Sequence, residues 1–491
     1  MSKLTNAWAP EEARILTREN ANSLVKRIYA LAHGGGDTWI NALSWWSGEL
    51  RWSRNRVSMA SDRRDMVILV SRMVHGGIGY AETNQSDDAS LEGAVRAAER
   101  LAKRRSTNDP ADMERDLTDS TSPVTKIWSD ASYDATAETR AHLVETLTSG
   151  AEAKGMLSAG YMEVSGMSGL ADSNTGFNLA DGMRPPLDTL DGLPTRMKYD
   201  AWTLGQCSMT VRDPKGSGSG WAGLAGYDWG AIDSNALAER ALQKCIASLN
   251  PVRIEPGRYT VILEPQAVCD LVDLLMGNQN FERPATELGS GPFVQGPDDA
   301  LKINRTKLGL KIMDERITIS HDPTDPLLGV YPEIGEGPVT WIDKGVLKTL
   351  NYTRYHAETS LNRNASAITR PSYRMSGGET SIDEMIATTK RGLLVTRFSN
   401  LAVLDGRSVL ATGLTRDGLW LIENGKISKA VNNMRITESP LFVLNQVRQL
   451  GVPVPVFRIG KYKYGYAGPW SAIVPPIKAD DFSFTATIDA I

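Results

Sequence analysis

The sequence changes character near residue 250, and this change limits the folds that the chain can adopt. Before that point, segments with helical spacing of apolar residues alternate with strand-like blocks, and the expected helices are 10–32, 90–104, 136–154 and 233–248. After it, most segments are short, β-rich and separated by tight turns, among them 315–323, 337–350, 392–398 and 408–431. We therefore expect an α+β protein and not a doubly wound parallel sheet. The predicted domains are an N-terminal α/β domain with an antiparallel sheet and helices (1–250) and a β-rich, barrel- or sandwich-like C-terminal domain (251–491).

The chain length bears on the number of domains, and the net charge bears on the partners. A chain of 491 residues is too long for one hydrophobic core, so at least two domains are expected. The formal net charge is -4. Binding to a nucleic-acid backbone needs clustered Lys and Arg, so we expect no nucleic-acid partner.

Cysteine usage and hydropathy bear on the compartment. The three cysteines, Cys207, Cys245 and Cys269, are far apart and form no CxxC pair. This pattern favours a reducing environment over a disulfide framework. The start, MSKLTNAWAPEEARIL, has no apolar signal region, and no run approaches 18 apolar residues. A cytoplasmic protein without membrane contact is expected.

A local zinc site is not visible among the histidines. The chain has five of them (His33, His75, His142, His321 and His356), and none lies three to five residues from another. A helical zinc site needs two imidazoles on one face together with a Glu base. Distant histidines could still converge in space, for example His356 or His321 with Asp270.

Two other candidate motifs do not lie in the sequence context that their chemistry needs. Cys269 lies in ILEPQAVCDLVDLL, a strand that runs into an apolar helix, so a buried small hydrophobe is expected there. Gly218, Gly220 and Gly223 formally satisfy GxGxxG, but no βαβ unit surrounds them. We expect the glycine-rich segment 213–230 to be a flexible hairpin tip or loop.

A long polar connection, residues 354–386, is the first candidate for a binding site. It carries Arg and Tyr side chains that could hold a peptide carboxylate or backbone, and it ends in a helix capped around Thr380 and Ser381 with Glu384. The alternative is a solvated crossing loop. The candidate substrate-binding residues are Arg354, Tyr355, His356, Arg370, Tyr373 and Arg374.

Several segments in one order resemble the TldD/PmbA family. They include 73–103, with its strand, turn, strand and helix; 257–275, GRYTVILEPQAVCDLVDLL; and the β-rich segments 307–326, 337–357, 380–396 and 418–431. The resemblance covers most of residues 40–475. It implies the fold of that family and a relation to zinc peptidases that carry an HExxxH helix and a cysteine near the C-terminus.

This chain departs from the catalytic pattern at the positions that matter for zinc. Pro265 stands where the first His would be, Gln266 where the Glu base would be, and Asp270 where the second His would be. No cysteine follows residue 269, and the 461–467 region reads KYKYGYA. The departure resembles the PmbA/TldE branch, whose members are metal-free partners of a zinc-bearing subunit.

The resemblance implies a function through a partner. We expect no cofactor in this chain, zinc in a TldD-like partner subunit, and a shared chamber that admits unfolded peptide. This chain would contribute chamber walls and strand edges for the peptide backbone. The alternative is a stand-alone homodimer that binds peptide or protein without peptidase activity.

Overall fold

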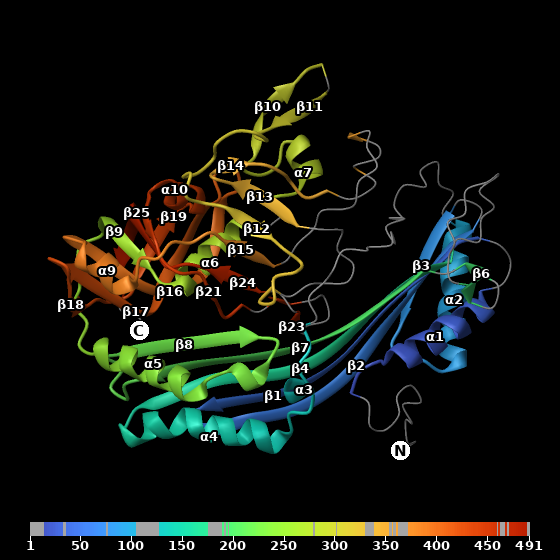
Figure 1. Cartoon of the computed structure of the whole chain (residues 1–491), viewed down its shortest axis with the longest axis horizontal. Helices are drawn as coiled ribbons and strands as arrows, with labels where there is room; N and C mark the ends of the chain where they lie inside the picture. The colour runs from blue at the N-terminus through green and yellow to red at the C-terminus, as the bar shows by residue number, and fades with distance from the viewer. Residues whose placement is uncertain are drawn as a thin grey trace.

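The computed structural model describes residues 14–32, 36–74, 77–104, 127–174, 189–190, 193–194, 196–277, 280–300, 302–328, 338–352, 356, 360–361, 372–458, 460–461, 467–468 and 471–488. Within these residues the protein is α+β with sheets dominant, which confirms the predicted fold class. Figure 1 shows one large sheet with helices below it in the view, and the β-rich C-terminal part above it.

The first half is built on a six-stranded antiparallel sheet in the order β3-β2-β1-β4-β7-β8. Strands β1 and β2 form a long hairpin whose two turn residues, Arg54 and Asn55, both have positive φ, as a type I′ turn requires. The strands are β1 (Thr38–Ser53), β2 (Arg56–Val74), β3 (Gly77–Thr83), β4 (Leu157–Asn174), β7 (Arg196–Arg212) and β8 (Ser219–Gly226).

Four helices of the first half pack on one face of this sheet. They are α1 (Arg18–Leu31), α2 (Asp88–Arg104), α4 (Ala137–Ala153) and α5 (Ser234–Ala247). Helices α2, α4 and α5 confirm their predictions, whereas the helix predicted over 10–32 begins only at Arg18, after its N-cap Thr17. Alternate β1 residues bury against them: Ile40 packs in the core with α1 and α2, and Trp46 and Leu50 pack in the core with α4 and α5. In Figure 1, α4 and α5 lie on the side of the sheet away from the C-terminal part.

The glycine-rich segment 213–230 differs from its prediction. Only its start is a turn; Gly220 and Gly223 lie within strand β8. A Cβ on Gly220 would stand 2.2 Å from the carbonyl oxygen of Ala241 in α5. The glycine is therefore needed because helix and strand backbones approach closely there.

The second half contains a closed barrel of five strands. The order is β16-β9-β25-β19-β17, and β16 pairs with β17 to close it. Strand β18 (Lys426–Ala430) extends the sheet beside β17, and β20 (Val447–Leu450) pairs with β25. The barrel strands are β9 (Gly257–Leu263), β16 (Arg391–Asp405), β17 (Leu410–Glu423), β19 (Met434–Glu438) and β25 (Ile477–Thr487).

A second six-stranded sheet lies beside the barrel, in the order β14-β13-β12-β15-β24-β21. The two share one hydrophobic core, in which Leu263 and Phe482 of the barrel join Trp341 and Tyr373 of the second sheet. Its strands are β12 (Ile319–His321), β13 (Val339–Asp343), β14 (Val346–Leu347), β15 (Tyr373–Met375), β21 (Val454–Pro455) and β24 (Ala472–Val474).

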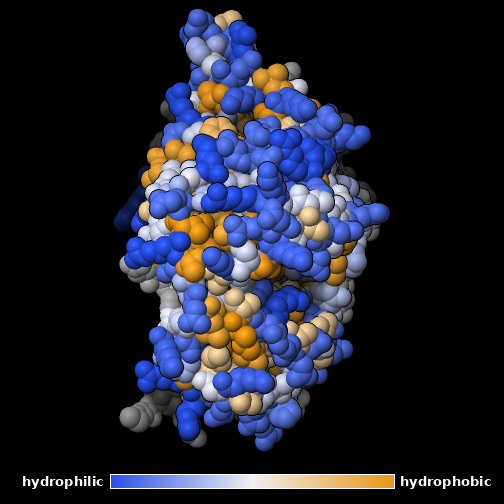
Figure 2. Space-filling view, turned by 90° about the vertical axis from the view of Figure 1, so that its left-hand side faces the viewer, coloured by the Kyte–Doolittle hydropathy of each residue, from blue (hydrophilic) through white to orange (hydrophobic). Residues whose placement is uncertain are grey.

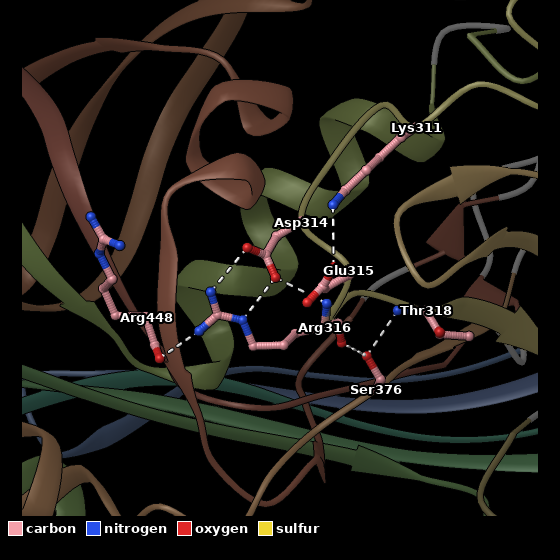
Figure 3. Close-up of polar contacts among 7 residues, drawn as sticks. All are labelled: Lys311, Asp314, Glu315, Arg316, Thr318, Ser376 and Arg448. Atoms are coloured by element: carbon pink, nitrogen blue, oxygen red, sulfur yellow. Dashed lines mark hydrogen bonds and ion pairs between the residues drawn. The ribbon is translucent and has the colours of Figure 1, made fainter.

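A polar cluster ties the second sheet to β20 (Figure 3). The guanidinium of Arg316 donates two hydrogen bonds to the carboxylate of Asp314, of 2.7 and 2.9 Å, and a third of 2.6 Å to the carbonyl oxygen of Arg448 in β20. Ser376 accepts from the N–H of Thr318 at 2.8 Å and donates to the carbonyl oxygen of Arg316 at 2.7 Å. These bonds fix the chain that enters β12.

The two halves meet through a buried polar contact. Asp417 of β17 is 1% exposed and accepts a hydrogen bond of 2.6 Å from the hydroxyl of Ser219 in β8. Arg397 of β16 donates to the same carboxylate and lies over the ring of Trp221, 4.9 Å from its centre. The indole N–H of Trp420 donates to the carbonyl oxygen of Ala247 at 3.1 Å. Strand β8 and helix α5 are thereby anchored to the barrel.

The surface on the α9 (Ile382–Ala387) and α5 side of the molecule is mixed. Figure 2 shows separate groups of hydrophobic residues there, set among hydrophilic ones. Of the helices that the structure describes, none combines the length and the apolar character needed to cross a membrane.

Candidate functional site

Helix α6 (Pro265–Met276) follows β9 directly and is the centre of the candidate site. Pro265 occupies the first turn, where its missing N–H is not needed. One side of the helix is buried in the core through Ala267, Val268, Leu271, Val272 and Leu275. The residues at spacings of four and seven, Gln266, Asp270 and Asp273, share the other side.

Both carboxylate oxygens of Asp270 already accept hydrogen bonds. Gln266 Nε2 donates to Oδ1 at 3.0 Å, and the backbone N–H of Phe398 in β16 donates to Oδ2 at 2.8 Å. Burial raises the pKa of Asp270 to about 7, against the opposing effect of these two hydrogen bonds and of the nearby charge of Arg397. Asp270 therefore connects α6 to β16.

A second polar group lies one turn further along α6. Arg458 Nε donates to both oxygens of Asp273, at 2.9 and 3.0 Å, and the hydroxyl of Tyr373 donates to Oδ1 at 2.8 Å. The Arg458 guanidinium also lies over the Tyr373 ring, 5.1 Å from its centre. Burial and the charge of Asp273 raise the pKa of Tyr373 well above its usual value, so the phenol stays a donor.

Cys269 is buried, as predicted, and lies in helix α6, where it has polar neighbours. Its Sγ is 3.6 Å from the hydroxyl of Tyr373 and 3.8 Å from Asp273 Oδ2. Burial raises the pKa of this thiol well above its usual value, and the charge of Asp273 adds to the effect. A protonated thiol is a poor nucleophile and a poor metal ligand.

The residues on this face do not fit a zinc-binding site. Pro265 has no ligand atom, and the oxygens of Asp270 are occupied as acceptors. In the described part of the chain, no group of three or more His, Cys, Asp or Glu side chains is placed to hold a metal ion. His321 Nδ1 instead lies 3.1 Å from the carbonyl oxygen of Ser372, and His356 Nε2 lies 3.2 Å from Glu287. Residues 462–466, in the region where the C-terminal cysteine would be, lie outside the described residues.

The three described members of the predicted binding set have different contacts. Tyr373 lies against α6, whereas Arg374 donates to Asp325 at 2.7 Å and His356 lies beside Glu287. Arg354, Tyr355 and Arg370 lie outside the described residues. A role of this segment in substrate binding stays a prediction.

The sequence reasoning missed two members of the site. Asp273 carries a weak signal, because it shares the helical side of Gln266 and Asp270. Arg458 carries none, because it is 185 residues from Asp273 and reaches it only through the tertiary fold.

Residues 256–486, which include α6, the barrel and the second sheet, match the family model of the PmbA/TldA metallopeptidase C-terminal domain. Residues 256–486 thus form a C-terminal domain of the PmbA/TldD family. The resemblance to the TldD/PmbA family that the sequence indicates is thereby confirmed.

Relatives and solved structures agree with the TldD/PmbA assignment. A metalloprotease of Methanothermobacter thermautotrophicus is 25% identical over 257 residues, which are 50% of this chain and 52% of the relative. A metalloprotease of Archaeoglobus fulgidus is 25% identical over 185 residues, 34% of this chain and 41% of the relative. This chain thus spans about half the length, or less, of these curated relatives.

Two solved structures share the fold over almost their whole length. TldE of Thermococcus kodakarensis has a TM-score of 0.72 at 17% identity, covering 94% of this chain and 99% of that one. A proposed modulator of a DNA gyrase from Thermotoga maritima has a TM-score of 0.73 at 14% identity, with the same coverage. At these identities the likeness shows only the fold of this chain.

Proposed function

We propose that this chain is the non-catalytic, metal-free subunit of a TldD/TldE-type zinc metallopeptidase complex that degrades or processes small unfolded peptides. Its partner is a TldD-like subunit that carries the HExxxH motif and the zinc. This chain shapes the chamber, binds no nucleic acid and acts in the cytoplasm.

The observation that carries the proposal is the closed polar side of α6. The helix, its strand and its core packing are in place, yet Gln266 and Phe398 satisfy the carboxylate of Asp270, and Arg458 and Tyr373 satisfy that of Asp273. A zinc-bound nucleophile needs an open coordination position and a base that positions the water. Here the same positions are used for internal hydrogen bonds, which supports a structural role for the helix.

The test is co-purification with a TldD-type protein from the same genome, followed by metal analysis and a peptide cleavage assay. We expect less than stoichiometric zinc in this chain alone, and cleavage of an unstructured peptide only when the partner is added. A partner whose HExxxH glutamate is replaced by glutamine is the matched control: it should still form the complex but should not cleave. Stoichiometric zinc in the isolated chain, or chelator-sensitive cleavage by it, would overturn the proposal.

The oligomeric state decides between this proposal and its alternative. A stable homodimer that ignores every TldD-type partner would identify the chain as a stand-alone peptide- or protein-binding module of the same fold. Sedimentation of the chain alone and with an equimolar partner separates the two outcomes.

A further inference from the structure

A cavity of about 300 Å³ lies where the end of the N-terminal sheet meets the C-terminal half. Its walls come from the middle of β7 and the end of β8 on one side and from β21 and Val456 on the other. Most of the lining side chains are apolar, among them Ile127, Leu204, Leu224, Ile232, Pro455 and Val456. A volume at the lower limit of ligand pockets suits one bulky side chain better than a cofactor.

Two sheet edges border this cavity. β8 is the last strand of the N-terminal sheet, and β21 is the last strand of the second C-terminal sheet. The N–H and C=O groups on an outer edge can pair with an extended chain. Pro455 in β21 has no N–H, so β8 is the better edge for a backbone ladder. Within the described residues, Leu224, Ala225 and Gly226 pair with β7 alone.

Polar groups at the cavity are fixed in place. The hydroxyl of Thr203 donates to the carbonyl oxygen of Tyr227 at 2.7 Å and accepts from the N–H of Ser129 at 2.9 Å. Asp228 Oδ1 accepts from the Ser129 hydroxyl at 2.8 Å and from the N–H of Gly230 at 3.0 Å. The carboxylate gives the lining a negative charge, which disfavours an acidic occupant.

The cavity and the polar side of α6 share two chain segments. Ser471 lines the cavity, and its carbonyl oxygen accepts from the N–H of Tyr373 at 3.1 Å. Val456 lines the cavity two residues before Arg458, which binds Asp273. A chain held along β8 with a side chain in the cavity is therefore close to the α6 face.

We propose that this cavity binds a bulky apolar side chain of an extended peptide whose backbone pairs with the edge of β8. The proposal rests on the proposed function, since it names the class of peptide that the complex takes. It assigns to this chain a specificity for apolar residues in unfolded peptides.

The test measures peptide binding to the full chain by isothermal titration calorimetry. The probe is a short capped threonine peptide with one central leucine. Two comparison peptides carry a central serine, or the same leucine with N-methylated neighbours that cannot donate to β8. Each should bind at least about tenfold more weakly, because a buried leucine or several backbone bonds are lost.

Variants test the place of binding. Ala231 is an exposed lining residue, so Ala231→Trp fills the cavity without touching the core, and Leu327→Ser removes an exposed part of its apolar wall. Both variants should weaken binding of the leucine peptide at least about fivefold, because less apolar area is buried. Ala153→Trp, at an exposed alanine at the end of α4, is the matched control and should leave binding unchanged.

The inference is overturned if the leucine peptide does not bind, or if binding is indifferent to Ala231→Trp and to the central residue. That result can be told apart from failure of the proposed function. Peptide binding at the cavity without any zinc-bearing partner leaves the inference standing, whereas a working complex whose cleavage ignores the cavity variants removes it.

Discussion

The side-chain amide of Gln266 donates a hydrogen bond of 3.0 Å to the carboxylate of Asp270, one turn further along α6. In a zinc-bearing relative of the kind that the resemblance implies, these two positions would hold the base and a ligand. Here they bind each other, and the second oxygen of Asp270 is taken by the N–H of Phe398. These two hydrogen bonds connect α6 to β16.

The buried carboxyl of Asp270 predicts a specific dependence of stability on pH. Burial raises the pKa of Asp270 from its ordinary 3.8 to about 7 in the folded protein. The folded state therefore holds the proton more tightly than the unfolded state between these values, and the free energy of unfolding should fall as the pH rises from about 4 to about 7. Asp270→Asn removes this titration and keeps both a donor and an acceptor.

We expect Asp270→Asn to be more stable than the native chain at pH 8, by on the order of 1–2 kcal/mol, and to lose the advantage near pH 4. Urea unfolding at both pH values measures this. Asp405→Asn is the control, because hydrogen bonds from Ser408 lower the pKa of this exposed carboxyl and no gain at pH 8 is expected there. Parallel stability curves for Asp270→Asn and the native chain would contradict the prediction.

The pair of Arg458 and Asp273 should show strong energetic coupling. Arg458 is only 12% exposed in this pair, so its partner's removal leaves a poorly solvated charge. In a cycle of Arg458→Met, Asp273→Asn and the double variant, we expect each single variant to cost about 2–3 kcal/mol and the coupling to exceed about 1 kcal/mol. The exposed pair of Arg258 and Asp481 gives the comparison cycle, with coupling below about 1 kcal/mol. Equal coupling energies in the two cycles would contradict the prediction that burial strengthens the pair of Arg458 and Asp273.

The contact between the halves depends on Asp417, which has positive φ and is buried. Asp417→Asn keeps a residue type that tolerates this backbone but removes the charge that binds Arg397. We expect a loss of about 2–3 kcal/mol in the free energy of unfolding. We also expect faster proteolysis near 213–218, since β8 is held by the Ser219 hydroxyl bond to the same carboxylate.

Asp481→Asn is a close control for that variant. Asp481 also has positive φ and an arginine partner, but the pair is exposed on both sides. Its replacement should cost less than about 1 kcal/mol. If the two variants lose the same stability, the buried contact has no special role at the junction.

Local sequence patterns predict helices and strands, but they do not predict contacts between residues that are far apart in the sequence. Apolar residues at helical spacing predicted α2, α4 and α5, and the capping box of Ser381 and Glu384 marked the start of α9. The pairing of Arg458 with Asp273 joins positions 185 residues apart, and no local pattern encodes it. Gly220 and Gly223 lie within β8 and not in the predicted flexible tip, because glycine marks both loops and close backbone approach.

Whether a glycine serves a flexible loop or a close backbone approach can be measured within strand β8. Gly220→Ala would place a Cβ 2.2 Å from the Ala241 carbonyl oxygen and 2.3 Å from the Cys245 N, so α5 must shift. We expect a loss of about 1–3 kcal/mol in the free energy of unfolding, by urea titration with tryptophan fluorescence. Gly226→Ala in the same strand meets nothing within 4 Å and should change stability by less than about 0.5 kcal/mol. If β8 were a flexible tip, both substitutions would be tolerated equally; a loss confined to Gly220 establishes that the glycine serves the packing of α5 on the sheet.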